Sequence, residues 1–207
     1  MCGRFSLTVP ANTLVQHFHL KNGLSMVPRY NIAPSQTIPV LKEPETIDFL
    51  TWGLVPKWME SGTNSGFINA RVETIRQKPS FRGAFQHRRC LVIADGYYEW
   101  KPLGRTKQPF YIHREDKGVF AFAGIWEENT CAILTTVAHT RFLEIHDRMP
   151  MIVPSSLYSA WLKPNPDPKQ LLEHLAEPFL MDNFIADPVS TKVNSPVFDG
   201  PECIQPL

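Results

Sequence analysis

The frequency of proline constrains the fold of this chain more than any other feature. Nineteen of the 207 residues are proline, and they occur along the whole sequence. Proline lacks a backbone donor and interrupts both helix interiors and central strands. The sequence therefore predicts many short elements separated by turns.

Several segments between prolines have the pattern of short helices. Pro10 and Pro168 suit the first turn of a helix, and Ser155 or Ser156 suits a cap. Pro150 ends a segment that has room for one or two helical turns. The helical segments expected are 9–20, 139–150, 154–164 and 167–176.

Apolar and alternating runs predict β-strands in much of the remaining chain. Asp95-Gly96 is a turn signal, and residues 101–109 have the composition of a loop. Because strands outnumber the short helices, we expect one α+β domain over residues 1–207, built on a mixed or antiparallel sheet system. The strands expected are 37–43, 46–55, the start of 89–100, 110–115, 119–128, 131–138 and 187–196.

The bulk composition is that of an ordinary globular protein, with 43% hydrophobic and 20% charged residues. No apolar run approaches the ~18 residues that a membrane span requires. The first residues lack the basic and apolar regions of a secretory signal. We therefore expect a cytoplasmic monomer without a membrane partner.

The four cysteines lie far apart and form no CxxC pair. A zinc site requires clustered ligands, and disulfides are rare in a reducing compartment. We expect no metal and no cofactor. Cys90 and Cys131 stand in apolar runs and are expected in the core.

The net charge of +1 is too small to make the whole molecule a polycation. Nucleic-acid binding would require basic residues gathered on one face, and one short span is rich in them. An ordinary solvated surface is the alternative. The basic residues of this span are Arg71, Arg76, Lys78, Arg82, Arg88 and Arg89.

Four short blocks carry polar residues within apolar surroundings. In "FINARVET", an extended chain would project Asn69, Arg71 and Glu73 from one face. Each block taken alone also has a structural interpretation, such as a half-exposed strand. The other blocks are "YNIAP" with Asn31, "GYYEW" with Glu99, and "IHDRMP" with His146, Asp147 and Arg148.

The chain begins "MCGRF", so removal of Met1 would leave Cys2 with a free α-amine and a thiol two carbons apart. Such a 1,2-aminothiol exists only at an N-terminal cysteine. The alternative is that Cys2 is a small apolar residue at the start of a buried strand.

The blocks "MCGRF", "YNIAP", "WGLVPKW", "NARVET", "ADGYYEW" and "IHDRMP" occur in this order and resemble those of the SRAP family, the SOS-response-associated peptidase-like, abasic-site processing proteins. The resemblance covers essentially the whole chain. It implies a compact α+β domain with a barrel-like β core and short peripheral helices. It also implies a protein that binds single-stranded DNA, either alone or at junctions, and crosslinks itself to abasic sites.

The resemblance also implies roles for individual residues. Cys2 would be the crosslinking residue, and Asn69, Glu99 and His146 would complete the catalytic set. Stacking on Trp58 is a further expectation, whereas Trp52 is expected in the core. The DNA-binding residues expected are Arg4, Lys57, Trp58, Arg71, Arg82, Thr135 and Arg148, with Thr135 beside the lesion.

An aminothiol suits this reaction because an amine attacks an aldehyde to give an imine, and a nearby thiol closes the imine to a stable thiazolidine. An α-amine has a pKa of about 7.7–8.0, so part of it is neutral near pH 7. Glu99 and His146 would carry protons, in roles that the sequence leaves interchangeable.

Two other functions fit part of the sequence. N-terminal-nucleophile amidohydrolases also begin with a Cys-Gly pair and use the thiol as nucleophile. A non-covalent reader of damaged or modified single-stranded DNA would use only the arginines and tryptophans. Peptidase activity, if present, would be confined to removal of Met1.

Overall fold

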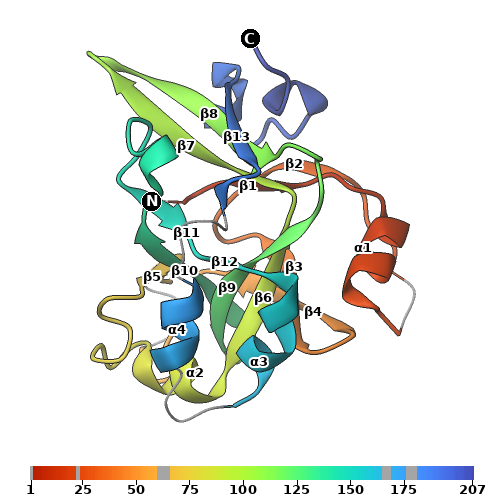
Figure 1. The fold of residues 1–207 in the computed structure, drawn as a ribbon, viewed down its shortest axis with the longest axis vertical. Coiled ribbons are helices and arrows are strands. Elements are labelled where there is room, and N and C mark those ends of the chain that lie inside the picture. Colours follow the sequence, from red (N-terminus) through yellow and green to blue (C-terminus); the bar gives the residue numbers. More distant parts are fainter. Residues whose placement is uncertain (1, 22–23, 60–65, 165–168, 176–180) are drawn as a thin grey trace.

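A computed structural model describes residues 2–21, 24–59, 66–164, 169–175 and 181–207. These residues form two β-sheets stacked along the long axis of the molecule, with short helices around the lower one (Figure 1). The sheets contain most of the regular structure, so the predicted α+β class is confirmed.

The larger sheet closes into a barrel. Its strands follow the order β10-β4-β3-β6-β9, and β9 pairs again with β10 in antiparallel register. The link between β10 and β4 is parallel, with Cys131 opposite Trp52. Closure removes unpaired edges from these strands. The five are β3 (Thr37–Glu43), β4 (Thr46–Trp52), β6 (Arg89–Ala94), β9 (Phe120–Glu127) and β10 (Thr130–Val137).

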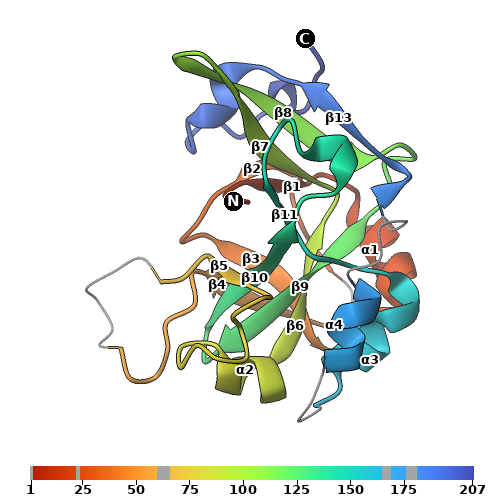
Figure 2. The ribbon, with the colours of Figure 1, turned by 60° about the vertical axis from the view of Figure 1, so that its left-hand side comes forward.

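Three short strands extend this sheet. β5 (Asn69–Arg71) pairs in parallel with the upper half of β10, and β11 (Arg148–Pro150) pairs with β10 in antiparallel register. β12 (Ile152–Val153) pairs with β9. β5 and β11 therefore both flank the end of β10 that faces the smaller sheet (Figure 2).

The smaller sheet has the order β13-β8-β7-β1-β2. Its short central strand β1 places Phe5 opposite Tyr97 and Ser6 opposite Gly96. The N-terminal strand is thereby held between two neighbours above the barrel. The five strands are β1 (Phe5–Leu7), β2 (Arg29–Ile32), β7 (Gly96–Leu103), β8 (Thr106–Arg114) and β13 (Phe184–Pro188).

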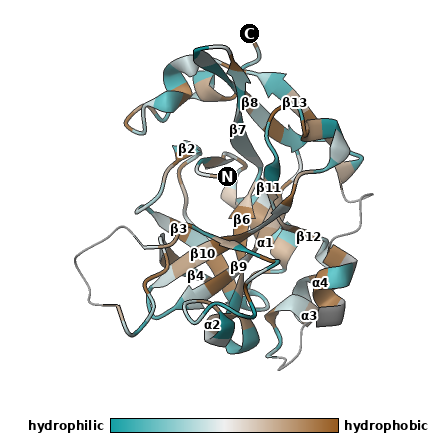
Figure 3. Cartoon of the chain, turned by 90° about the vertical axis from the view of Figure 1, so that its left-hand side faces the viewer, coloured by the Kyte–Doolittle hydropathy of each residue, from teal (hydrophilic) through white to brown (hydrophobic). Residues whose placement is uncertain are grey.

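The core fills the barrel and the space beneath β1, where the strands are the most apolar part of the chain (Figure 3). The ring of Phe5 packs edge-on against Trp52 and Phe122, with centroids 5.2 and 5.9 Å away. Cys90 and Cys131 are fully buried, which confirms the expectation for these cysteines and for Trp52.

The helices are short and peripheral, as predicted. α1 (Ala11–Phe18) buries Leu14 and Phe18, and neither Ser155 nor Ser156 acts as a side-chain cap. No helix among the described residues is long and apolar enough to cross a membrane. The other helices are α2 (Arg82–His87), α3 (Tyr158–Leu162), α4 (Lys169–Leu175) and the 3-10 helices η1 (Thr140–Phe142), η2 (Ser155–Leu157), η4 (Thr191–Asn194) and η5 (Pro201–Cys203).

The expected turn at Asp95-Gly96 is wrong, because the chain does not fold back there. It passes from β6 in the barrel to β7 in the smaller sheet. The Asp95 carboxylate accepts hydrogen bonds from Ser6 Oγ at 2.5 Å, Thr8 Oγ1 at 2.7 Å and Val9 N at 3.0 Å, and another from Thr8 N. Asp95 therefore ties the crossing point to the end of β1.

Three other predicted boundaries differ from the structure. The expected loop at 101–109 is a β-hairpin that turns at Gly104, where φ is +59°. Residues 139–150 contain the single 3-10 turn η1 and then β11, so the helical part ends before Pro150. The expected strand at 187–196 ends at Pro188 and gives way to η4. Pro168 lies outside the described residues.

We predict that Asp95→Ala lowers the free energy of unfolding by about 2–3 kcal/mol, because it leaves buried donors without an acceptor. Urea denaturation with an unchanged m-value measures this loss. Asp116→Ala is the control: its ion pair with Arg114 is largely exposed, so the loss is expected within about 1 kcal/mol. Equal effects of the two variants would contradict the assignment.

Candidate functional site

Cys2 lies three residues before the start of β1 and is fully buried. Its carbonyl oxygen accepts a hydrogen bond from Asn69 Nδ2 at 2.8 Å, and its thiol donates to the Arg4 carbonyl oxygen at 3.8 Å. Burial, reinforced by the charge of Glu99, raises the pKa of the thiol well above its ordinary value. The thiol is therefore protonated at neutral pH.

Asn69 joins the N-terminal residues to the barrel. It begins β5, where its neighbour on β10 is Ile133. Its amide nitrogen holds Cys2, whereas its buried Oδ1 has no hydrogen-bond partner among the described residues. Asn69 Oδ1 can therefore accept a hydrogen bond from a donor near the N-terminus.

Glu99 and His146 approach each other from two elements. Glu99 lies in the middle of β7, and His146 lies between η1 and β11. Glu99 Oε2 is 3.9 Å from His146 Nε2. Burial raises the pKa of Glu99 to about 7, and the charge of Asp147 adds to this. The carboxyl group therefore titrates near neutrality.

The local backbone orients the imidazole of His146. The backbone N–H of Arg148 donates to His146 Nδ1 at 3.0 Å, so Nδ1 carries the lone pair in the neutral ring. Nε2 then bears the proton and faces Glu99. Asp147 Oδ1 also lies 3.0 Å from Nδ1, a contact that is an ion pair only when the ring is protonated. Burial lowers the pKa of His146, which favours the neutral form.

Arg148, Glu73 and Thr135 form a hydrogen-bonded cluster that extends from the buried Thr135 to the exposed Glu73. Arg148 donates to both Glu73 carboxylate oxygens, at 2.6 and 3.1 Å, and to the Thr135 carbonyl oxygen at 2.7 Å. Glu73 lies in the turn after β5, so the extended alignment expected for "FINARVET" stops at Arg71. Thr135 is fully buried, with its Oγ1 3.3 Å from Arg148 Nη2.

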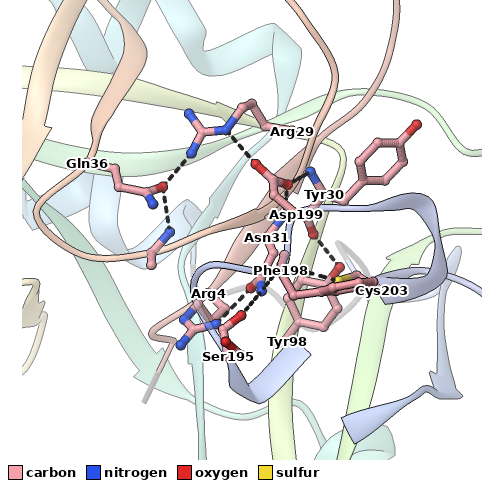
Figure 4. Close-up of polar contacts among 11 residues, drawn as sticks. Arg4, Arg29, Tyr30, Asn31, Gln36, Tyr98, Ser195, Phe198, Asp199 and Cys203 are labelled. Carbon is pink, nitrogen blue, oxygen red and sulfur yellow. Dashed lines mark hydrogen bonds and ion pairs between the residues drawn. The ribbon is translucent and has the colours of Figure 1, made fainter. Parts of the chain in front are cut away.

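Arg4 contacts Asn31 of β2, whose amide lies against the C-terminal segment (Figure 4). Its guanidinium donates to Asn31 Oδ1 at 2.8 Å, to the Val193 carbonyl oxygen at 2.6 Å and to that of Asn194 at 3.2 Å. Asn31 lies within β2, and its amide nitrogen donates to the same Val193 carbonyl oxygen and to those of Ser195 and Phe198. This network fixes the start of β1.

The remaining candidates lie outside this group. Arg71 is exposed at the end of β5, opposite Thr135. Trp58 is 64% exposed on the connection between β4 and β5, and Lys57 lies 3.8 Å from Glu127. Arg82 is exposed at the start of α2, at the end of the barrel remote from the N-terminus (Figure 1). The expected basic span therefore does not form one face.

The sequence interpretation missed the β7–β8 hairpin, which projects beside the N-terminus (Figure 1). Lys101 forms an ion pair with Glu144 at 3.0 Å, which holds the hairpin near η1. The positive charge of Lys107 contributes to the lowered pKa of His146. Residues 100–109 contain three basic residues, Lys101, Arg105 and Lys107, and no acidic one. This local charge imbalance was the available signal.

The described residues thus gather an amide, a carboxyl group and an imidazole around a buried cysteine. The two titratable side chains have pKa values displaced toward each other, which suits proton transfer near neutral pH. No group of three or more histidine, cysteine, aspartate or glutamate residues in the described part of the chain is arranged to hold a metal ion.

Comparison with known proteins assigns the family. The SOS response associated peptidase (SRAP) family matches residues 1–196. The chain belongs to the SRAP family. The abasic site processing protein YoqW of Bacillus subtilis is 36% identical over 99% of both chains, and the abasic site processing protein YedK of Escherichia coli is 33% identical over 86% of this chain and 85% of its own.

The fold comparison agrees with the family assignment. A crystal structure of a protein from Bacteroides thetaiotaomicron is 26% identical to this SRAP chain and covers 100% of both chains, with a TM-score of 0.86. The barrel and the smaller sheet therefore belong to one shared architecture.

We predict that Glu99→Gln raises the free energy of unfolding relative to wild type at pH 8 but not at pH 4.5. The folded-state pKa is about 7 against 4.5 for an unperturbed carboxyl, so wild type loses stability as the pH rises through this window. The difference approaches about 3 kcal/mol. Urea denaturation across the pH range measures it.

Glu73→Gln is the matched control for this prediction. Burial acts to raise the pKa of Glu73, but its hydrogen bond with Arg148 prevails and the pKa is lowered. Its substitution is therefore expected to cost stability at pH 8, the opposite sign. A pH-independent difference between Glu99→Gln and wild type would contradict the raised pKa.

Proposed function

We propose that this protein binds single-stranded DNA and forms a covalent thiazolidine crosslink between Cys2 and the aldehyde of an abasic site. Two observations support the proposal. The curated relatives YoqW and YedK are named abasic site processing proteins. Cys2 carries the two groups that the reaction requires, and it lies beside Asn69 and within the electrostatic reach of Glu99. The placement of Cys2 beside these polar side chains carries the argument.

The crosslink forms in two stages. After Met1 is removed, the α-amine of Cys2 attacks the open-chain aldehyde, and loss of water gives an imine. The thiol then adds to the imine carbon and closes a five-membered ring. A lysine would form the imine but has no thiol to close it, so a terminal cysteine gives the more lasting product.

The site divides the proton transfers between Glu99 and His146. Glu99, with a pKa of about 7, accepts a proton from the α-ammonium, whose ordinary pKa is about 7.7–8.0. Neutral His146 offers its Nε2 proton to the sugar ring oxygen or to the departing hydroxyl. The unpartnered Oδ1 of Asn69 accepts from the amine or a sugar hydroxyl.

Removal of Met1 is the prerequisite, because the amine of Cys2 is an amide nitrogen until then. Peptidase activity, where it occurs, is confined to this self-removal, and ordinary methionine trimming achieves the same result. The buried, protonated thiol disfavours an N-terminal-nucleophile amidohydrolase, which needs a reactive thiolate.

The DNA strand is proposed to cross the face that bears the N-terminus. We assign the exposed Arg71, two residues after Asn69, to binding phosphate and the exposed Trp58 to stacking on bases, and the β7–β8 hairpin adds further positive charge. Arg4 and Arg148 already have several internal acceptors, so we assign them mainly to shaping the site. Lys57, Thr135 and Arg82 remain secondary candidates. We propose that the protein acts as a cytoplasmic monomer associated with the nucleoid through DNA.

We predict that trimmed wild-type protein and a single-stranded oligonucleotide with one abasic site give a shifted band on a denaturing gel. The intact mass of the product is expected to equal the sum of both molecules less one water. Cys2→Ala removes the thiol and is expected to give no heat-stable band. Cys90→Ala, which alters a buried core cysteine, is the control and is expected to crosslink like wild type.

Four results would contradict the mechanism. Absence of the band with trimmed wild type excludes the crosslink, and an equally stable band with Cys2→Ala excludes the thiazolidine. Hydrolysis of free glutamine by the trimmed protein would favour the amidohydrolase. Undiminished non-covalent binding without any crosslink would favour a DNA reader.

We predict that Arg105→Gln/Lys107→Gln reduces the salt dependence of binding to intact single-stranded DNA. Each lost phosphate contact lowers the slope of log K against log[salt] by about 0.7, so the double variant is expected to lose about 1.4. Lys21→Gln/Lys42→Gln, on the α1 side, is the control with the same charge change. Equal slopes for both variants would contradict the role of the hairpin.

A further inference from the structure

One fully buried tyrosine hydroxyl stands out because no hydrogen bond accounts for it. The hydroxyl of Tyr97 has no partner among the described residues. Other buried tyrosines of the chain are satisfied: Tyr98 donates to the Tyr30 carbonyl oxygen at 2.6 Å, and Tyr111 lies 2.9 Å from Ser6 Oγ. An unsatisfied buried hydroxyl costs stability, so its retention calls for a functional reason.

The strand register places this hydroxyl on the reacting side of β7. Tyr97 and Glu99 are two residues apart and project from the same face of the strand. Tyr97 is also opposite Phe5 in β1, three residues after Cys2, and it shares one core cluster with Cys2. Burial, then the charges of Glu99 and Cys2, raise the pKa of Tyr97. The phenol therefore keeps its proton at neutral pH, and its pKa responds to the charges of both groups.

The proposed reaction creates a need for such a donor. Among the described residues, the Cys2 thiol donates a hydrogen bond to the Arg4 carbonyl oxygen. When the thiol loses its proton, that carbonyl oxygen repels the sulfur and gives it no stabilisation. A developing thiolate in a buried site requires a hydrogen-bond donor, because charge is costly in a low-dielectric environment.

We propose that Tyr97 is a further catalytic residue, whose hydroxyl donates a hydrogen bond to the Cys2 sulfur while the thiazolidine ring closes. This inference rests on the proposed crosslink. In the step, the thiol proton passes to the Glu99 carboxylate and the sulfur electron pair forms the bond to the protonated imine carbon. The π electrons of the C=N bond move to nitrogen, which becomes a neutral amine. Tyr97 keeps its own proton throughout.

Measuring imine formation and ring closure separately distinguishes a catalytic role of Tyr97 from a structural one. Borohydride reduces and traps the imine, whereas the heat-stable band formed without borohydride reports ring closure. Tyr97→Phe is expected to slow ring closure about tenfold or more, by analogy with the loss of a donor to a developing anion. Trapping of the imine is expected to stay within about twofold of wild type, because the amine is unaffected.

Thermal unfolding supplies an independent readout. Tyr97→Phe removes an unsatisfied hydroxyl without changing the ring, so its Tm is expected to equal or exceed that of wild type. Tyr98→Phe is the matched control: it projects from the other face of β7 and is expected to lower the Tm while closing the ring at the wild-type rate.

Each outcome decides the inference. Wild-type ring closure in Tyr97→Phe, or an equal loss of both stages, overturns the role of Tyr97 and leaves the crosslink intact. Slow closure in Tyr98→Phe as well would point to a general effect of β7 and also overturn it. Absence of any covalent product from trimmed wild type overturns the proposed function itself.

Discussion

Burial of the N-terminal residues between two sheets is the constraint on which the rest of the site depends. β1 is only three residues long, yet it pairs on both sides and packs Phe5 into the barrel. Chain termini are usually mobile, so several contacts are needed to hold this one. Asn69 holds Cys2 from the barrel, and Asp95 holds Val9 from the crossing between the sheets. The C-terminal segment holds Arg4 through the Val193 carbonyl oxygen.

The same burial sets the electrostatics of the site. Removal from water disfavours charge on both the thiol of Cys2 and the carboxyl of Glu99, and it disfavours protonation of His146. The raised pKa of the Glu99 carboxyl group lies close to the ordinary pKa of an α-amine, so these two groups exchange protons readily. A surface-exposed terminus with the same residues would lack this match, because water would restore their ordinary pKa values.

Parts of the fold were predictable because they depend on local sequence. The bounds of β3 agree with the expected strand 37–43, since alternation and β-branched residues act within the strand itself. α1 follows from the spacing of Leu14 and Phe18. Residues 101–109 of the β7–β8 hairpin were mistaken for a loop because polar residues such as Lys101 and Lys107 have little strand propensity of their own. They are extended because the two strands pair, with Lys101 opposite Gln108 and Lys107 opposite Pro102. Long-range pairing overrides such weak propensities.

The sequence by itself determined the chemical groups: an aminothiol that becomes available at Cys2, and the blocks that supply Asn69, Glu99 and His146. Only the tertiary structure decided their protonation and partners, because burial and distance are properties of packing between β1, β5 and β7. It also separated Arg4, which binds the C-terminal segment, from the exposed Arg71, although the two looked alike in the sequence. A residue type fixes which bonds are possible, and the fold selects among them.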